Sequence, residues 1–96
     1  MLSDETEIFN AYKNKLKGRL YMLLCQREEK GDWEKVLDSL ILEVQGLGSN
    51  SINWWPFIGK LNTLRFLSYD YFRKTIFDCI SLVSGLEKPD TSHELL

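Results

Sequence analysis

The chain has 96 residues, of which 44% are apolar and 27% are charged, as in a single folded globular domain. Its formal net charge of -2 argues against a general nucleic-acid binder, because such proteins usually carry a basic surplus. The longest unbroken apolar run, Leu20 to Cys25, is far shorter than the roughly 20 residues of a membrane span. Residues 1–7 carry acidic and no basic side chains, unlike a secretory signal. We therefore expect a cytoplasmic protein with neither a nucleic-acid nor a membrane partner.

The first predicted helix runs from about Asp4 to about Glu29. Its apolar residues recur at steps of three and four, which places them on one face of a helix. That core stripe consists of Phe9, Tyr12, Leu16, Leu20 and Leu23. Gly31 is expected to end this helix and Asp32 to cap the next one.

The second predicted helix is short and strongly amphipathic. Its apolar stripe follows the i, i+3, i+4, i+7 pattern without a gap and comprises Trp33, Val36, Leu37, Leu40, Ile41 and Val44. Residues 46–51 concentrate glycine, serine and asparagine, which predicts a loop.

The third predicted helix covers residues 54–84. Neither glycine nor proline interrupts residues 60–84, and the apolar positions keep one helical face throughout. This third core stripe comprises Trp54, Phe57, Ile58, Leu61, Leu64, Ser68, Phe72, Thr75, Ile76, Cys79 and Val83. This pattern favours one helix of about 30 residues, although Ser68-Tyr69-Asp70 offers a place for a kink or a capped break. Gly85 is expected to end it, so that residues 1–85 form one domain and residues 86–96 a flexible polar tail.

These lengths predict an uneven all-α bundle of two long helices and one short one. At about 1.5 Å per residue, the long helices reach roughly 40 Å and the short one about 20 Å. A groove between the two long helices would then stay partly open. We expect a second copy of the chain to cover it, which makes the protein a homodimer.

Two further sets of side chains support that expectation. Small residues repeat every seven positions on the outer face of the first helix, and a second aromatic band lies beside the core stripe of the third. The predicted interface consists of Ala11, Gly18, Tyr21, Met22, Cys25, Trp55, Phe66, Tyr69 and Phe77.

A ligand site is the alternative hypothesis. Arg65 lies inside an apolar stripe and needs an anion or a carboxylate, for which Asp38 and Glu43 are candidates. Trp54 either seals the end of the core or anchors a ligand. Together Arg65 and Trp54 could bind a small apolar or anionic ligand in the groove between the long helices.

No catalytic or metal-binding pattern appears. Cys25 and Cys79 are far apart in sequence, and the single histidine, His93, has no partner motif. We expect no enzymatic activity and no cofactor. The leading hypothesis is a non-enzymatic protein interaction module of unknown biological role, self-associating or bound to another protein.

Overall fold

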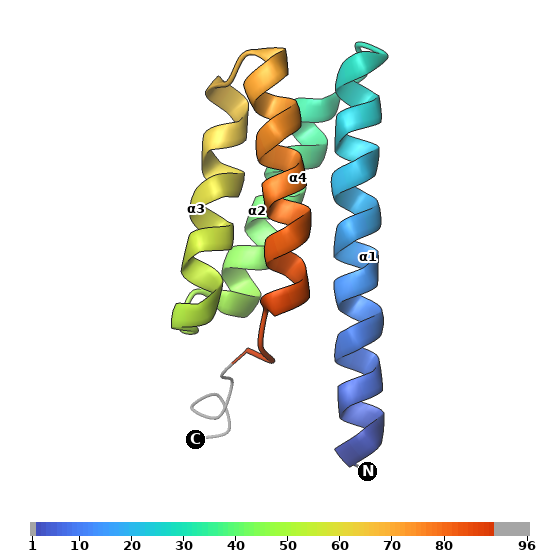
Figure 1. Ribbon diagram of the computed structural model, residues 1–96, viewed down its shortest axis with the longest axis vertical. Helices are drawn as coiled ribbons and strands as arrows, with labels where there is room; N and C mark the ends of the chain where they lie inside the picture. The colour runs from blue at the N-terminus through green and yellow to red at the C-terminus, as the bar shows by residue number, and fades with distance from the viewer. Residues whose placement is uncertain (1, 90–96) are drawn as a thin grey trace.

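The computed structural model describes residues 2–89, and the side chains of residues 2–4 lie outside that description. In this part of the chain four α-helices occur and no strand, which confirms the predicted all-α class. The α-helices are α1 (Leu2–Glu28), α2 (Trp33–Gly48), α3 (Trp55–Thr63) and α4 (Tyr69–Gly85). Two 3₁₀ turns, η1 (Ile52–Trp54) and η2 (Leu64–Phe66), flank α3. Consecutive helices run in opposite directions (Figure 1).

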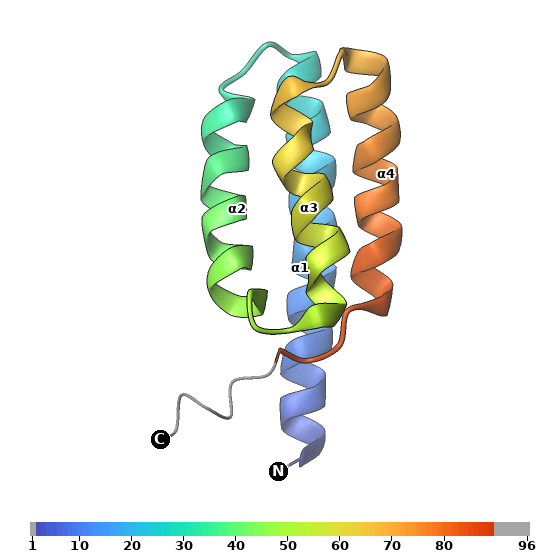
Figure 2. The same cartoon turned by 90° about the vertical axis from the view of Figure 1, so that its left-hand side faces the viewer.

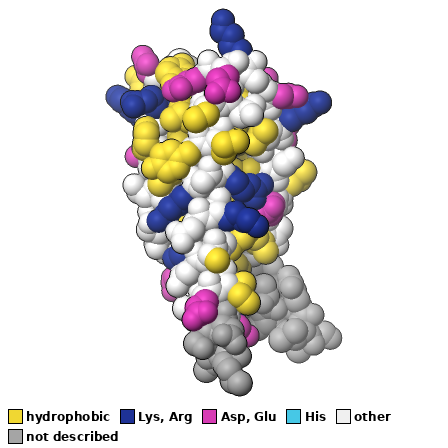
Figure 3. Space-filling model, turned by 90° about the vertical axis from the view of Figure 1, so that its right-hand side faces the viewer, with side chains coloured by type: hydrophobic (Ala, Val, Ile, Leu, Met, Phe, Trp, Pro, Cys, Tyr) yellow, Lys and Arg dark blue, Asp and Glu magenta, His cyan; other side chains and the backbone are white. Residues whose placement is uncertain are grey.

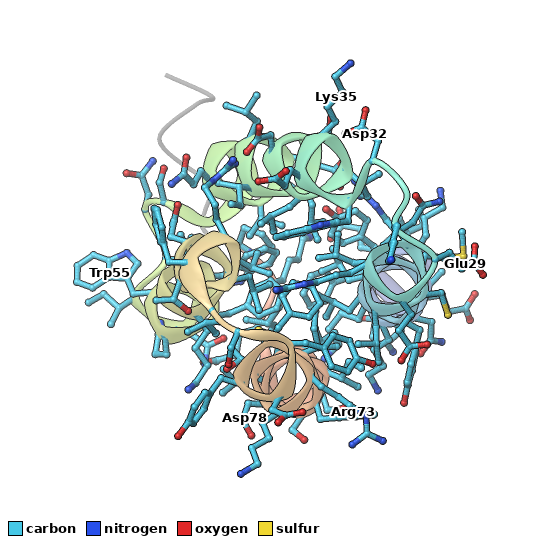
Figure 4. The ribbon with its side chains drawn as sticks, turned by 90° about the horizontal axis from the view of Figure 1, so that it is seen from above. Glu29, Asp32, Lys35, Trp55, Arg73 and Asp78 are labelled. Atoms are coloured by element: carbon cyan, nitrogen blue, oxygen red, sulfur yellow. The ribbon has the colours of Figure 1, made fainter. Side chains whose placement is uncertain are left out.

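The helices stand at the four corners of a bundle. α1 contacts α2 and α4, and α3 contacts the same two helices from the opposite corner (Figure 4). The first turns of α1 extend past the end of the other three helices (Figure 2). The predicted layout of two long helices and one short one is therefore wrong, because α4 fills the space that was assigned to a second copy.

The continuous helix predicted over residues 54–84 is broken where the alternative placed a break. After η2, Leu67 and Ser68 take extended backbone angles, with ψ of 145° and 165°. This turn reverses the chain, so that α4 packs against both α1 and α3. If residues 54–84 formed one straight helix, the second half of its apolar stripe would extend past the end of α2 and would stay exposed.

Most of the core consists of residues that the periodicity assigned to it, and Leu24 and Leu86 are buried with them. Leu16, Leu20 and Leu23 of α1 are fully buried, while Phe9 and Tyr12 pack against them at the protruding end. The other helices contribute buried side chains from their own predicted stripes: Leu37, Leu40, Val44, Trp54, Phe57, Leu61, Leu64, Phe72, Ile76, Cys79 and Val83. The three predicted core stripes are confirmed in most of their members, whereas Ser68 of the third stripe is exposed.

The connection from α1 to α2 differs from the expected one in its left-handed residue. Lys30 has a φ of 59°, whereas Gly31 has no positive φ. The amide of Gly31 then donates to the carbonyl of Gln26 at 2.7 Å and closes the helix end. Asp32 precedes α2 as expected, but its side chain makes no capping hydrogen bond.

The loop predicted over residues 46–51 is shorter than expected, because α2 continues through Gly48. Gly48 is buried against Trp54, and a β-carbon at that position would lie 2.4 Å from the Cε3 atom of the indole. Only a residue without a side chain permits this close approach. The connection to η1 is therefore residues 49–51.

The first four residues of the predicted tail lie against the bundle. Leu86 is buried in the core, and the backbone carbonyl of Glu87 accepts a hydrogen bond from the Trp54 indole at 2.7 Å. The amide of Glu87 donates to Asn53 Oδ1, and Lys13 Nζ donates to the carbonyl of Leu86 at 3.1 Å. The rest of the predicted tail, residues 90–96, lies outside the described residues.

Candidate functional site

The structure divides the nine predicted interface residues between two sides of the bundle. Trp55 points away from the bundle at the corner opposite α1 (Figure 4). Phe66 lies on η2, at the other end of α3. The remaining seven residues lie on α1 and α4, and we call this set the α1–α4 face: Ala11, Gly18, Tyr21, Met22, Cys25, Tyr69 and Phe77.

The α1–α4 face is the larger of the two predicted groups. Tyr21 of α1 and Phe77 of α4 meet edge to face, with ring centroids 6.1 Å apart. Tyr21, Met22 and Phe77 remain 48%, 57% and 39% exposed. Figure 3 shows hydrophobic side chains gathered on the upper half of the molecular surface over α1, with charged side chains around them. An apolar patch with a charged border is typical of a contact surface.

Small residues flank this aromatic pair on the outer side of α1. Ala11, Gly18 and Cys25 are exposed, as the seven-residue spacing predicted. A β-carbon built on Gly18 would have no atom within 4 Å, so nothing in the chain itself requires a glycine there. Tyr69 lies at the upper end of the face, where its hydroxyl donates a hydrogen bond to Glu28.

Trp55 borders a second concave region, which we call the α2–α3 hollow. Its volume is about 700 Å³, and it is lined by Leu42, Gln45, Gly46, Ser49, Trp55, Ile58 and Gly59. The Trp55 indole donates to the carbonyl of Ser49 at 3.0 Å, which holds the ring beside the hollow. Trp55 therefore cannot take part in the same flat contact as Gly18, because the two lie on opposite sides of the molecule.

Arg65 forms the ion pair that the sequence suggested. Its guanidinium contacts the carboxylate of Asp38 across α2 and η2, and both side chains stay partly exposed. Asp38 thus supplies the carboxylate partner that the guanidinium requires in this stripe. Glu43, the other candidate partner, pairs with Arg19 at 2.7 Å instead.

The groove predicted between the two long helices is changed by the break in the second of them. The helix predicted over residues 54–84 is α3 and α4 in the structure: α4 packs directly against α1, and α3 stands at the corner opposite α1. Trp54 is fully buried, with Phe9 and Phe57 at ring-centroid distances of 6.4 Å and 6.5 Å. Trp54 and Arg65 also lie at opposite ends of α3 and do not form one site.

A polar cluster in which Tyr12 and Glu43 have shifted pKa values joins α1 and α2. The hydroxyl of Tyr12 donates to Glu43, which also accepts from Arg19 at 2.7 Å. The hydrogen bond from Tyr12 and that from Arg19 lower the pKa of Glu43, while burial and the neighbouring carboxylate raise the pKa of Tyr12. The cluster stabilises the α1–α2 contact and keeps Tyr12 neutral.

The cysteines differ in environment. Cys25 is exposed on α1, whereas Cys79 is buried in α4. Burial raises the pKa of the Cys79 thiol to about 12. Within residues 2–89, no group of three or more His, Cys, Asp or Glu side chains is placed to hold a metal ion, and no helix is long and apolar enough to cross a membrane.

One half-buried cation, Arg27, was missed by the sequence analysis. The guanidinium of Arg27 stacks on Trp33 and Phe72, at 4.7 Å and 4.5 Å from their ring centroids. Arg27 follows Leu23 by four residues and therefore continues the core stripe of α1, which was the available signal. It closes the upper end of the bundle, where α1, α2 and α4 meet.

Comparisons with family models, with curated proteins and with solved structures find no match to this chain. The fold defines it as a small four-helix bundle of the all-α class. Its function is therefore inferred from the surfaces described above.

Proposed function

We propose that this chain is a non-enzymatic helical interaction protein that self-associates through the α1–α4 face. The observation that carries the proposal is the exposed aromatic pair of Tyr21 and Phe77 beside Met22. Three large apolar side chains in mutual proximity gain free energy when a partner covers them, at roughly 25 cal/mol per Å² of apolar surface. Their exposure after folding indicates that intramolecular packing leaves this area for a partner.

The small residues beside the aromatic pair support a second copy as the partner. In a two-fold symmetric dimer, the same patch is used by both subunits. A face centred on Gly18 lets the α1 helix of each subunit approach its counterpart closely, because no side chain separates the backbones there. Trp55 and Phe66 stay outside such a contact, so the α2–α3 hollow remains accessible in the dimer.

The experiment is light scattering at tens of micromolar protein, with two exposed helical glycines, Gly18 and Gly46, as a matched pair. For the native chain we expect a mass twice the 11.3 kDa of the monomer. Gly18→Leu should restore the monomeric mass, because the added side chain overlaps the partner helix. Gly46→Leu is the control, since Gly46 is also exposed in a helix with nothing within 4 Å of its β-carbon position.

Both substitutions place leucine where the monomer has room, so both chains should fold. A native chain that stays monomeric overturns self-association. A dimer that survives Gly18→Leu but is broken by Gly46→Leu moves the interface to the α2–α3 hollow and overturns the assigned face.

A further inference from the structure

A recess lies at the end of the bundle where α1 protrudes. Its volume is about 350 Å³, within the range of about 300–1,000 Å³ that small-molecule pockets span. Ile8, Phe9 and Tyr12 of α1 form one wall, and Leu47 of α2 forms another. Trp54 and Pro89 complete the lining, and we call this cavity the end recess.

Three segments of the chain, distant in sequence, build the end recess. The wall from α1 exists because this helix continues past the other three (Figure 2). Trp54 is held in place by its hydrogen bond to the Glu87 carbonyl, which also draws the segment leading to Pro89 across the end of the bundle. Trp54 belongs to the core, and Phe9 and Tyr12 pack against it, so the aromatic part of the lining is held by core packing.

The polar groups of the lining are already bonded within the chain. The Tyr12 hydroxyl donates to Glu43, and the Trp54 indole donates to Glu87. Among the described residues of the lining, Glu5 and Lys88 are the charged ones; they pair with each other at 2.9 Å and stay more than half exposed. A ligand thus meets aromatic and aliphatic surface, and any charged group it carried would be desolvated without a free partner.

From this geometry we propose that the end recess binds a small, uncharged, apolar molecule. The aromatic faces of Phe9 and Tyr12 and the side chains of Ile8 and Leu47 cover its surface, and affinity comes from the removal of apolar area from water. The Glu5–Lys88 pair marks the mouth and adds no net charge. Gly18, the position that tests the α1–α4 face, lies ten residues after Ile8 in α1, which is about 15 Å along the helix.

Two dyes that share one aromatic body test the proposal. N-phenyl-1-naphthylamine is uncharged, and 8-anilino-1-naphthalenesulfonate is the same body with an anionic sulfonate. We expect the uncharged dye to bind the full chain saturably at one site per chain, with a fluorescence increase. The sulfonate should bind at least about tenfold more weakly, because its charge finds no free cation.

The variant that tests the location is Ile8→Asp, and its control is Leu42→Asp. Ile8 and Leu42 are 69% and 72% exposed, so both chains should fold, yet only Ile8 borders the end recess. Ile8→Asp should weaken binding of the uncharged dye at least about tenfold, and Leu42→Asp should leave it unchanged.

Three results overturn the proposal. One is the absence of saturable binding by the uncharged dye to the native chain. A second is equal affinity for the sulfonate, which contradicts the ligand class. The third is loss of binding with Leu42→Asp, which moves the site to the α2–α3 hollow. Gly18→Leu should not change dye binding, so failure of the self-association proposal and failure of this one are distinguishable.

Discussion

Two glycines two positions apart in α2 should respond oppositely to the same substitution. A β-carbon at Gly46 would meet open space, whereas one at Gly48 would lie 2.4 Å from the Trp54 ring. That ring cannot move aside cheaply, because it is fully buried, packs on Phe9 and Phe57, and is held by its hydrogen bond to Glu87. We therefore expect Gly46→Ala to stabilise the protein and Gly48→Ala to destabilise it.

The magnitudes follow from two separate effects. Replacing an exposed glycine inside a helix by alanine stabilises a protein by about 0.5–1 kcal/mol, which is the expectation for Gly46→Ala. Forcing an extra methyl group into a packed core costs about 1–3 kcal/mol, which is the expectation for Gly48→Ala. The two variants should then differ by about 1.5–4 kcal/mol in the free energy of unfolding.

Thermal unfolding followed by circular dichroism measures this difference. For a domain of this size, 1 kcal/mol shifts the melting temperature by about 4–8 °C, so Gly46→Ala should melt at least about 6 °C above Gly48→Ala. Urea unfolding gives the free energies directly. A Gly48→Ala variant as stable as Gly46→Ala would refute the close approach of α2 to Trp54.

Three further outcomes are expected. Leu86→Ala should lower the free energy of unfolding by about 2–5 kcal/mol, because Leu86 is a buried core residue. Glu87→Ala should change the free energy of unfolding little, since the hydrogen bonds of Glu87 to the bundle come from its backbone atoms. Equal urea midpoints for the two variants would contradict the docking of this segment. In dilute solution a thiol reagent should modify one cysteine per native chain, Cys25, and both cysteines in denaturant, because Cys79 is buried with its pKa raised to about 12. Reaction of two thiols in the native protein, or of Cys79 in the native Cys25→Ser chain, would refute this. Folding lowers the pKa of Glu43 from 4.5, so the stability that this carboxylate contributes is complete above pH 4.5 and is lost as the pH falls through the lower folded value. The Glu43→Gln variant should therefore lose less stability on acidification than the native chain. If the two chains show the same pH profile of the urea midpoint, the Tyr12–Glu43–Arg19 cluster does not stabilise the fold in this way.

The amino-acid sequence was sufficient to predict the fold class and the core. Apolar residues at steps of three and four identify the buried face of a helix whatever it packs against, because the periodicity follows from helix geometry alone. Leu16, Leu40 and Ile76 are buried as this rule predicts. The exposed positions of Gly18 and Cys25 follow from the same rule, since they lie opposite the core stripe.

The periodicity of apolar residues does not predict the break between α3 and α4. The apolar stripes of the two helices stay in phase across Ser68, and neither glycine nor proline marks the turn. Leu67 and Ser68 can adopt helical or extended angles at similar local cost. The choice is made by α4, which buries Phe72, Ile76 and Cys79 against the rest of the bundle only if the chain reverses.

The candidate sites show the same division. The sequence predicted a carboxylate partner for Arg65, with Asp38 and Glu43 as candidates, because a guanidinium in an apolar stripe requires one. Only the structure shows that the partner is Asp38. The sequence could not show that Trp55 and Gly18 lie on opposite sides of the molecule, since that depends on the reversal at Ser68. The end recess likewise requires residues 8, 47, 54 and 89 to meet, and such long-range contacts are decided by the packing of whole helices and not by any local sequence pattern.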